Sequence, residues 1–236
     1  MSIFYIIGAL VIIIANAGRL GMVFSSIFRC AFTGEAVVGG VSGFVFLTAL
    51  QKGVGRGVFS NEAGLGSAPI AHATTSEENP VKQGLYGVFE VFMDTVVICT
   101  LTALVLMCAN VVPWGDPDMA GADAAILAFG TVFGSKLSSL FVAVAIFFFA
   151  FSTILSWSLY GSRCFGFLTK NRAIPVYKAV FVLAVAVGAV LKLSLVWDIA
   201  DTLNGFMAVP NLIALLALSG TVITMTRDYL REQRKN

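Results

Sequence analysis

Long runs without charged residues limit how this chain can fold. No Asp, Glu, Lys or Arg occurs from Leu137 to Ser162, from Thr95 to Gly115 or from Thr202 to Thr226. About 20 apolar residues, each rising about 1.5 Å along a helix, cross the roughly 30 Å hydrocarbon core of a bilayer. Each run is long enough for such a helix, so the sequence predicts an all-α integral membrane protein.

Composition agrees with this prediction and excludes several classes of function. Hydrophobic residues make up 58% of the 236 residues and charged residues 12%, whereas soluble domains carry about 25% charged residues. The net charge of +2 is too small to indicate a nucleic-acid partner. One histidine excludes a multi-histidine metal site, and the phosphate-loop, dinucleotide and nucleophile-elbow motifs are absent. The expected partner is the lipid bilayer, and no enzyme activity or cofactor is expected.

Further apolar segments raise the prediction to about six spans in one transmembrane domain, residues 1–236. The run Ile3–Ala15 is too short for a full span, so we expect the later part of a truncated one and a chain that is a fragment. Ala36–Gln51 leads into the second span, and Ala179–Leu191 with its flanks forms the fifth.

Charges between the runs predict the orientation. Only acidic charges occur in Val111–Asp123, which we expect outside, whereas Arg163–Lys178 is basic and expected in the cytoplasm. The same rule makes residues 227–236 a cytoplasmic tail and places the protein as a multi-pass protein of a plasma (inner) membrane. Arg19–Ala31 then falls on the outer side, where we expect an interfacial amphipathic helix.

Five glycines and Pro69 within Gly53–Ala73 predict a membrane helix that is interrupted near its middle. We expect the first half-helix to end near Val58–Phe59 and the second to begin at Leu65. Broken helices in transporters direct free carbonyl groups at cations and free N–H groups at anionic substrate groups. A kinked helix in which Arg56 and Glu62 neutralise each other is the alternative interpretation.

Other polar residues within the apolar runs have both functional and structural interpretations. Glu90 and Asp94 are spaced to share one helix face, and Asp94 is a candidate cation ligand or a partner of Arg56 or Lys52. Ser152 and Thr153 either complete a sodium site with backbone carbonyls or join helices. His72 is expected to cap a helix end, with proton relay as the alternative, and Asn204, Pro210 and Asn211 are expected to satisfy a kinked helix locally.

Four segments resemble the alanine or glycine:cation symporter family. The most specific is Gly-Arg-Gly-Val-Phe-Ser-Asn-Glu-Ala-Gly-Leu-Gly-Ser-Ala-Pro-Ile-Ala-His-Ala at 55–73. The likeness continues through 87–103, 147–161 and 204–216 and covers nearly the whole chain. It implies the second half of a leucine-transporter-type inverted-repeat fold, with a discontinuous helix near 53–73 and the first repeat absent.

The resemblance also implies which residues bind substrate and sodium. The unwound part of the discontinuous helix and one tryptophan would contact the amino acid, namely Phe59, Ser60, Asn61, Glu62, Ala63, Gly64 and Trp157. Ser152 and Thr153 match hydroxyls of a sodium site. Asp94 and the Phe149 carbonyl are the other predicted sodium ligands.

The sequence therefore predicts sodium-coupled symport of alanine or glycine by alternating access. The alternative is a non-transporting membrane subunit or remnant that requires the missing N-terminal half as a separate, complementary chain. A membrane-embedded hydrolase would need a nucleophile beside a base, and no serine forms a recognisable motif with His72.

Overall fold

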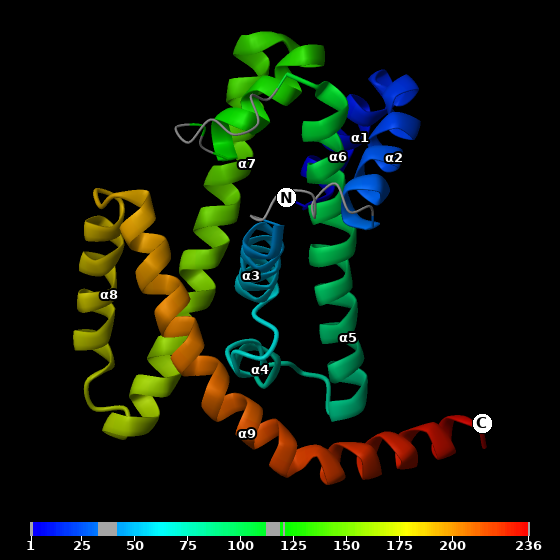
Figure 1. Ribbon diagram of the computed structural model, residues 1–236. Coiled ribbons are helices and arrows are strands. Elements are labelled where there is room, and N and C mark those ends of the chain that lie inside the picture. Colours follow the sequence, from blue (N-terminus) through cyan, green and yellow to red (C-terminus); the bar gives the residue numbers. More distant parts are fainter. Residues whose placement is uncertain (1, 33–41, 112–118, 120, 236) are drawn as a thin grey trace. The chain divides into compact units, whose positions relative to one another are not determined.

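The computed structural model describes residues 2–32, 42–111, 119 and 121–235, with side chains described outside 30–32 and 42–49. These residues form helices and no strand, which confirms the predicted all-α class (Figure 1). Two compact units are formed, one by Met1–Gly53 with Met93–Thr153 and one by Val54–Phe92 with Ile154–Asn236. The α-helices are α1 Ser2–Ala15, α2 Leu20–Phe32, α3 Ser42–Asn61, α4 Ala68–His72, α5 Pro80–Phe92, α6 Cys99–Ala109, α7 Gly121–Thr169, α8 Ile174–Gly188 and α9 Leu193–Gln233.

Three of the described helices are long and apolar enough to cross a membrane. They are Pro80–Ala109, Gly121–Thr169 and Leu193–Gln233. A fourth results if Ser2–Ala15 and Ala17–Arg29, which meet at 71°, form one bent span. Helix α8 has 15 residues, fewer than the about 20 that a full crossing needs.

The predicted total of six spans stays a prediction. Both the run 36–51 and the loop 111–123 lie partly outside the described residues. Helix α2, Leu20–Phe32, covers most of Arg19–Ala31, the segment predicted to be an amphipathic helix.

Helices α1, α6 and α7 build the core of the first unit. Ile12, Cys108 and Phe129 are fully buried there. Gly8 lets α1 approach α7 closely, because a Cβ at this position would collide with the ring of Phe141. Close packing of this kind is needed in a membrane, where lipid tails are as apolar as the side chains and give helices no hydrophobic reason to associate.

Arg19 closes the C-terminal end of α6 in this unit. Its guanidinium donates hydrogen bonds to the carbonyls of Cys108, at 3.1 Å, and Ala109, at 3.0 Å. The last carbonyls of a helix lack partners within the helix and carry partial negative charge, so a cation there is favourable. This contact accounts for Arg19, which together with Arg29 is a basic residue of the segment that the predicted orientation places on the outer side.

Replacing Arg19 by alanine should therefore destabilise the first unit. Hydrogen bonds to a charged group contribute about 1.5–3 kcal/mol each when buried, and because Arg19 is exposed we expect a smaller total loss of about 1–2 kcal/mol. Thermal unfolding in detergent should show a midpoint several degrees lower. Arg19→Lys keeps the positive charge without the forked geometry, so its midpoint should lie between those of the parent and Arg19→Ala. An unchanged midpoint for Arg19→Ala would contradict this role.

In the second unit, Asn79 and Pro80 stabilise the N-terminal end of α5. Asn79 Oδ1 accepts hydrogen bonds from the N–H groups of Val81, at 3.0 Å, and Lys82, at 3.1 Å, and Pro80 occupies the first helical position. The Lys82 ammonium lies 2.6 Å from Glu77 and lowers the pKa of that carboxyl. A lowered pKa contributes stability above the ordinary carboxyl pKa and loses it as the pH falls through the lowered value.

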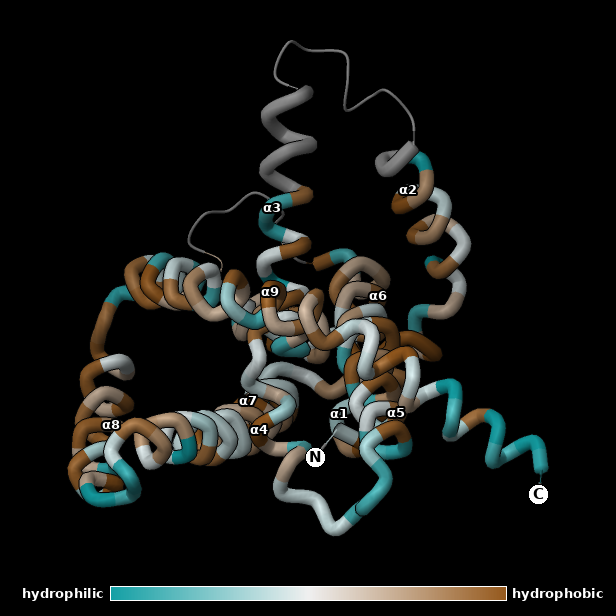
Figure 2. The backbone as a smooth tube through the Cα atoms, turned by 90° about the horizontal axis from the view of Figure 1, so that it is seen from below, coloured by the Kyte–Doolittle hydropathy of each residue, from teal (hydrophilic) through white to brown (hydrophobic). Residues whose placement is uncertain are grey.

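Each of the two longest helices contains a residue that disturbs regular helical structure. In α7, Gly134 has φ 74° and ψ 162°, so two helices meet there. In α9, Pro210 lies inside the helix and removes one backbone hydrogen bond. Figure 2 shows hydrophilic residues gathered toward the C-terminal end of α9, where the predicted cytoplasmic tail begins at Arg227.

Candidate functional site

The predicted interruption is present in the second unit, and both of its boundaries differ from the prediction. Helix α3 continues to Asn61, past Val58–Phe59, and the next helix begins at Ala68. The predicted start at Leu65 is wrong, because Gly64 and Gly66 have φ values of 84° and 80° and cannot continue a right-handed helix.

Helix α4 is also too short for the anion site expected at its N-terminus. It has five residues, with Pro69 in its first turn. Its N-cap residue, Ser67, makes no side-chain capping bond. The predicted carboxylate site on free N–H groups of a half-helix is therefore not supported by this element.

Polar side chains within the interruption stabilise its backbone. Asn61 Oδ1 accepts a hydrogen bond from the Ala63 N–H at 2.8 Å, and Ser67 Oγ donates to Glu62 Oε2 at 2.7 Å. Glu62 has φ 55°, a left-handed conformation that is uncommon for a residue other than glycine. Leu65 and Ser67 are almost fully buried, with 3% and 1% of their surface exposed. The segment is thus anchored at its centre and at its end.

Two aromatic residues of α7, Tyr160 and Trp157, lie near Glu62. The Tyr160 hydroxyl lies close to the Glu62 carboxylate and to Ser156. Trp157 contacts Tyr160 edge-on, with ring centroids 5.9 Å apart. Trp157 is therefore connected to the interruption through Tyr160, a residue that the sequence analysis did not identify.

A second unpredicted contact comes from α9. Asn211 Nδ2 donates a hydrogen bond to the Gly64 carbonyl at 2.9 Å, across 147 positions in sequence. The prediction that Asn211 serves its own kinked helix is therefore wrong. Its position directly after Pro210 in an apolar run was a signal of a special role, although sequence alone did not show the partner.

Arg56 pairs with α9 rather than with Glu62. Its two terminal nitrogens lie 3.2 and 3.1 Å from the two carboxylate oxygens of Asp201. The guanidinium carbon also lies 3.7 Å from the ring centroid of Trp197. The alternative in which Arg56 and Glu62 neutralise each other is therefore wrong, because Glu62 accepts a hydrogen bond from the Ser67 hydroxyl and Arg56 pairs with Asp201.

Phe59, a predicted substrate contact, belongs to the same group of side chains. Its ring packs against Trp197 with centroids 4.8 Å apart. We name Arg56, Phe59, Trp197 and Asp201 the α3–α9 cluster. A Trp and an Asp four residues apart on one helix share a face, which was the available sequence signal.

His72 joins α4 to α5 through both nitrogens of its ring. Nδ1 lies 2.7 Å from Gln83 Nε2, and Nε2 lies 3.4 Å from a carboxylate oxygen of Glu90. An imidazole with its proton on Nε2 satisfies both contacts. His72 is the last residue of α4, as predicted, and its side chain contacts another helix.

Asp94 lies in the first unit, in a π-helical turn at Met93–Ile98. Such turns are rare and often occur at functional sites, because the wider turn changes which side chains share a face. Glu90 lies just before this turn and in the other unit. A shared face for these two carboxylates stays a prediction.

The remaining predicted sodium ligands share one turn of α7. Ser152 Oγ and Thr153 Oγ1 both donate to the Phe149 carbonyl, at 3.0 and 2.9 Å. Ser and Thr commonly make this bond within helices. The bond uses the hydroxyl protons and leaves oxygen lone pairs, which are the groups a cation would require.

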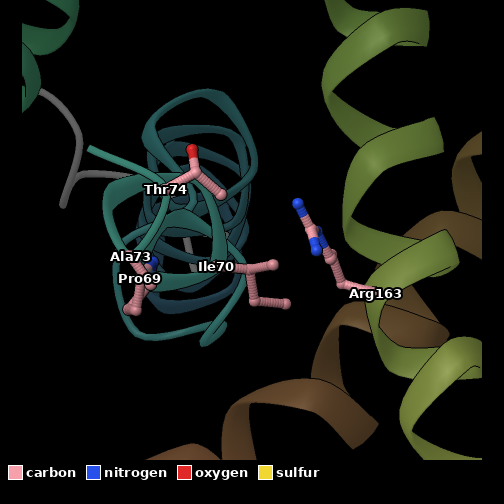
Figure 3. Close-up of a pocket in the computed structure, with 5 residues that line it drawn as sticks. All are labelled: Pro69, Ile70, Ala73, Thr74 and Arg163. Atoms are coloured by element: carbon pink, nitrogen blue, oxygen red, sulfur yellow. The ribbon is translucent and has the colours of Figure 1, made fainter. Parts of the chain in front are cut away.

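One open pocket of about 640 Å³ lies beside α4. Its lining consists of Pro69, Ile70, Ala73, Thr74 and Arg163. Figure 3 shows the Arg163 side chain extending from α7 toward the side where Ile70 and Thr74 lie. None of these five residues is a predicted substrate or sodium ligand, so the pocket does not support that assignment.

Comparison with known proteins identifies the family. Residues 1–236 match the sodium:alanine symporter family. The chain is 45% identical over 237 residues to the sodium/alanine symporter AgcS of Methanococcus maripaludis, covering 100% of this chain and 51% of that protein. It is 42% identical over 236 residues to an uncharacterized transporter of Haemophilus influenzae, again covering 100% and 51%. The amino-acid carrier protein AlsT of Bacillus subtilis is 35% identical, with 100% and 49% covered.

The chain thus spans about half the length of these curated relatives. The relatives and the family are transporters, which confirms the expectation that the protein is not an enzyme. The resemblance carried by the motif at 55–73 is confirmed as well. The chain belongs to the sodium:alanine symporter family.

Proposed function

We propose that this chain is part of a sodium-coupled symporter that carries alanine or glycine across a membrane by alternating access. The observation that carries the proposal is the interruption at 62–67, which follows α3 and holds Glu62, Gly64 and Gly66 at positive φ. Irregular backbone at membrane depth persists only where it packs in protein or lines a cavity, and transporters use it for substrate and ion sites. Family membership and the name of the Methanococcus relative support the same function.

In this proposal Phe59, Ser60, Asn61, Glu62, Ala63, Gly64 and Trp157 contact the amino acid, and Asp94, Phe149, Ser152 and Thr153 bind sodium. The fold is the second half of a leucine-transporter-type inverted repeat in a plasma (inner) membrane, with the C-terminus in the cytoplasm. One charge crossing 100 mV releases about 2.3 kcal/mol, which supports roughly 40-fold accumulation before any ion gradient is added.

Asn61 tests the substrate site. Asn61→Ala in the complete transporter should weaken alanine binding by about tenfold, because it removes both a polar contact and the bond to the Ala63 N–H. Asn61→Asp is the matched variant, since it keeps an oxygen for that N–H while it replaces the amide donor by a second oxygen and adds a negative charge. Equilibrium binding of radiolabelled alanine measures both variants. Unchanged affinity in Asn61→Ala would reject the substrate assignment.

The sodium site is tested by replacing Ser152 and Thr153 together with alanine. The sodium concentration for half-maximal alanine uptake should rise severalfold, because two oxygen ligands are lost while the Phe149 carbonyl remains. Ser162→Ala is the control, since its hydroxyl makes the same type of local bond, to the Leu159 carbonyl at 2.9 Å. A sodium curve that does not move in the double variant would remove these residues from the site.

A non-transporting subunit that needs a separate complementary chain is the second candidate, and the half-length coverage of the relatives favours considering it. Detection of the native polypeptide in its membrane with an antibody against Arg227–Asn236 separates the two. A band near twice the 25.0 kDa of this sequence supports the symporter. A band at 25.0 kDa, with sodium-dependent uptake only upon co-expression of a complementary chain, supports the subunit.

A further inference from the structure

The contact between Asn211 and the interrupted segment joins two parts of the chain that are far apart in sequence. Asn211 lies on α9 and donates from Nδ2 to the Gly64 carbonyl at 2.9 Å. Residue 64 has φ 84°, so its carbonyl cannot take part in a helical ladder. The side-chain amide therefore supplies the partner that the interrupted backbone has lost.

The same side chain also packs against Gly66. A Cβ built at residue 66 would lie 2.9 Å from Asn211 Oδ1, 3.1 Å from Cγ and 3.3 Å from Cβ. Contact this close means that the Asn211 side chain occupies the space that a side chain at residue 66 would need. Asn211 thus fixes one carbonyl and covers a second position two residues later.

We infer that Asn211 is a positioning residue, which holds the segment 62–67 in the shape that presents its polar groups to the transported amino acid. This inference rests on the function proposed above. Asn211 contacts the backbone of the segment and acts on the substrate through it. Both Asn211 and the segment belong to the second unit, so the contact is internal to one compact body.

Asn211→Asp is the sharpest variant, because aspartate has the same shape and replaces the donor with an oxygen that repels the Gly64 carbonyl. Asn204→Asp is the matched control, since Asn204 is a half-buried amide on the same helix. In the complete purified transporter, three quantities are measured: hydrogen exchange of the peptide covering 62–67, the Kd for alanine at saturating sodium, and the thermal midpoint.

We expect Asn211→Asp to increase exchange in the 62–67 peptide and to raise the Kd for alanine by about five- to tenfold, with Asn204→Asp near the parent value. The loss of one hydrogen bond corresponds to a change of this size. A thermal midpoint close to that of the parent would show that the change in affinity does not come from general unfolding.

Other results would overturn the inference. Faster exchange without a change in Kd would make the contact purely structural, and a higher Kd without faster exchange would mean that Asn211 acts directly on the substrate. No change in either quantity would show that the contact does not hold the segment. If the parent binds neither alanine nor glycine, the proposed function fails, and unchanged exchange would separately reject the hold of Asn211 on the segment.

Discussion

Replacing Gly66 by alanine is expected to abolish alanine uptake by the complete transporter and to destabilise the second unit by about 2–5 kcal/mol. Two costs add at this position. Residue 66 has φ 80°, which costs an L-residue roughly 1–2 kcal/mol. The new methyl group would also lie 2.9 Å from Asn211 Oδ1, and overpacking of this kind costs about 1–3 kcal/mol. Uptake and thermal unfolding in detergent measure the two effects.

Neighbouring glycines supply the controls for this prediction. Gly64 has φ 84° with nothing within 4 Å of an added Cβ, so Gly64→Ala should suffer the backbone cost alone. Gly57 lies inside α3 with open space around it, so Gly57→Ala should be neutral or stabilise by about 0.5–1 kcal/mol. Equal losses in Gly64→Ala and Gly66→Ala would mean that contact with Asn211 contributes nothing.

Sequence reasoning located the interruption because its causes are local. Glycine and proline lower helix propensity wherever they occur, so a cluster of them predicts an interruption. In a membrane protein such an interruption is tolerated only where the backbone packs in protein or lines a cavity. The boundaries were misplaced because some of the contacts at the interruption come from a residue far away in the sequence. The residues at positive φ also contact other side chains: Glu62 accepts a hydrogen bond from Ser67 Oγ, and Asn211 packs against Gly66, and composition does not encode either contact.

The partners of charged and polar groups were the part that sequence could not supply. Arg56 has Glu62 six residues away, yet it binds Asp201, which is 145 positions distant. Tyr160 and Asn211 reach the interruption from α7 and α9 in the same way. Which residues pair across such distances depends on how the helices pack. A single sequence shows which residues could pair, but it does not show how the helices pack.

Separation of Arg56 from Asp201 is expected to have the second large effect. The two side chains form a bidentate ion pair, and Trp197 stacks on the guanidinium at 3.7 Å. Exposed ion pairs contribute about 0.2–1 kcal/mol, but a forked geometry and a cation over an aromatic face each add to this. Both groups are about two-fifths exposed, at 36% and 42%. We therefore expect Arg56→Ala or Asp201→Ala to weaken the contact by about 1–3 kcal/mol.

The expected effect on transport follows from the two contacts that α9 makes with α3 and with the interruption. It contacts α3 before the interruption through the α3–α9 cluster, and it contacts the interruption itself through Asn211. If the α3–α9 cluster is lost, α3 can shift relative to the segment 62–67, which Asn211 still holds. Uptake by either single variant should accordingly fall about 10- to 100-fold, with protein levels in the membrane measured in parallel.

Exchange of the two charges distinguishes an ion pair from two unrelated essential residues. The double variant Arg56→Asp with Asp201→Arg restores the attraction and should recover part of the uptake lost in the single charge reversals. Recovery should be incomplete, because a carboxylate at residue 56 meets the negative face of the Trp197 ring. Adding Trp197→Leu to the double variant should remove that penalty. Uptake by this triple variant should then approach uptake by Trp197→Leu alone. If the swap is no better than the single reversals, the contact between α3 and α9 does not depend on this pair.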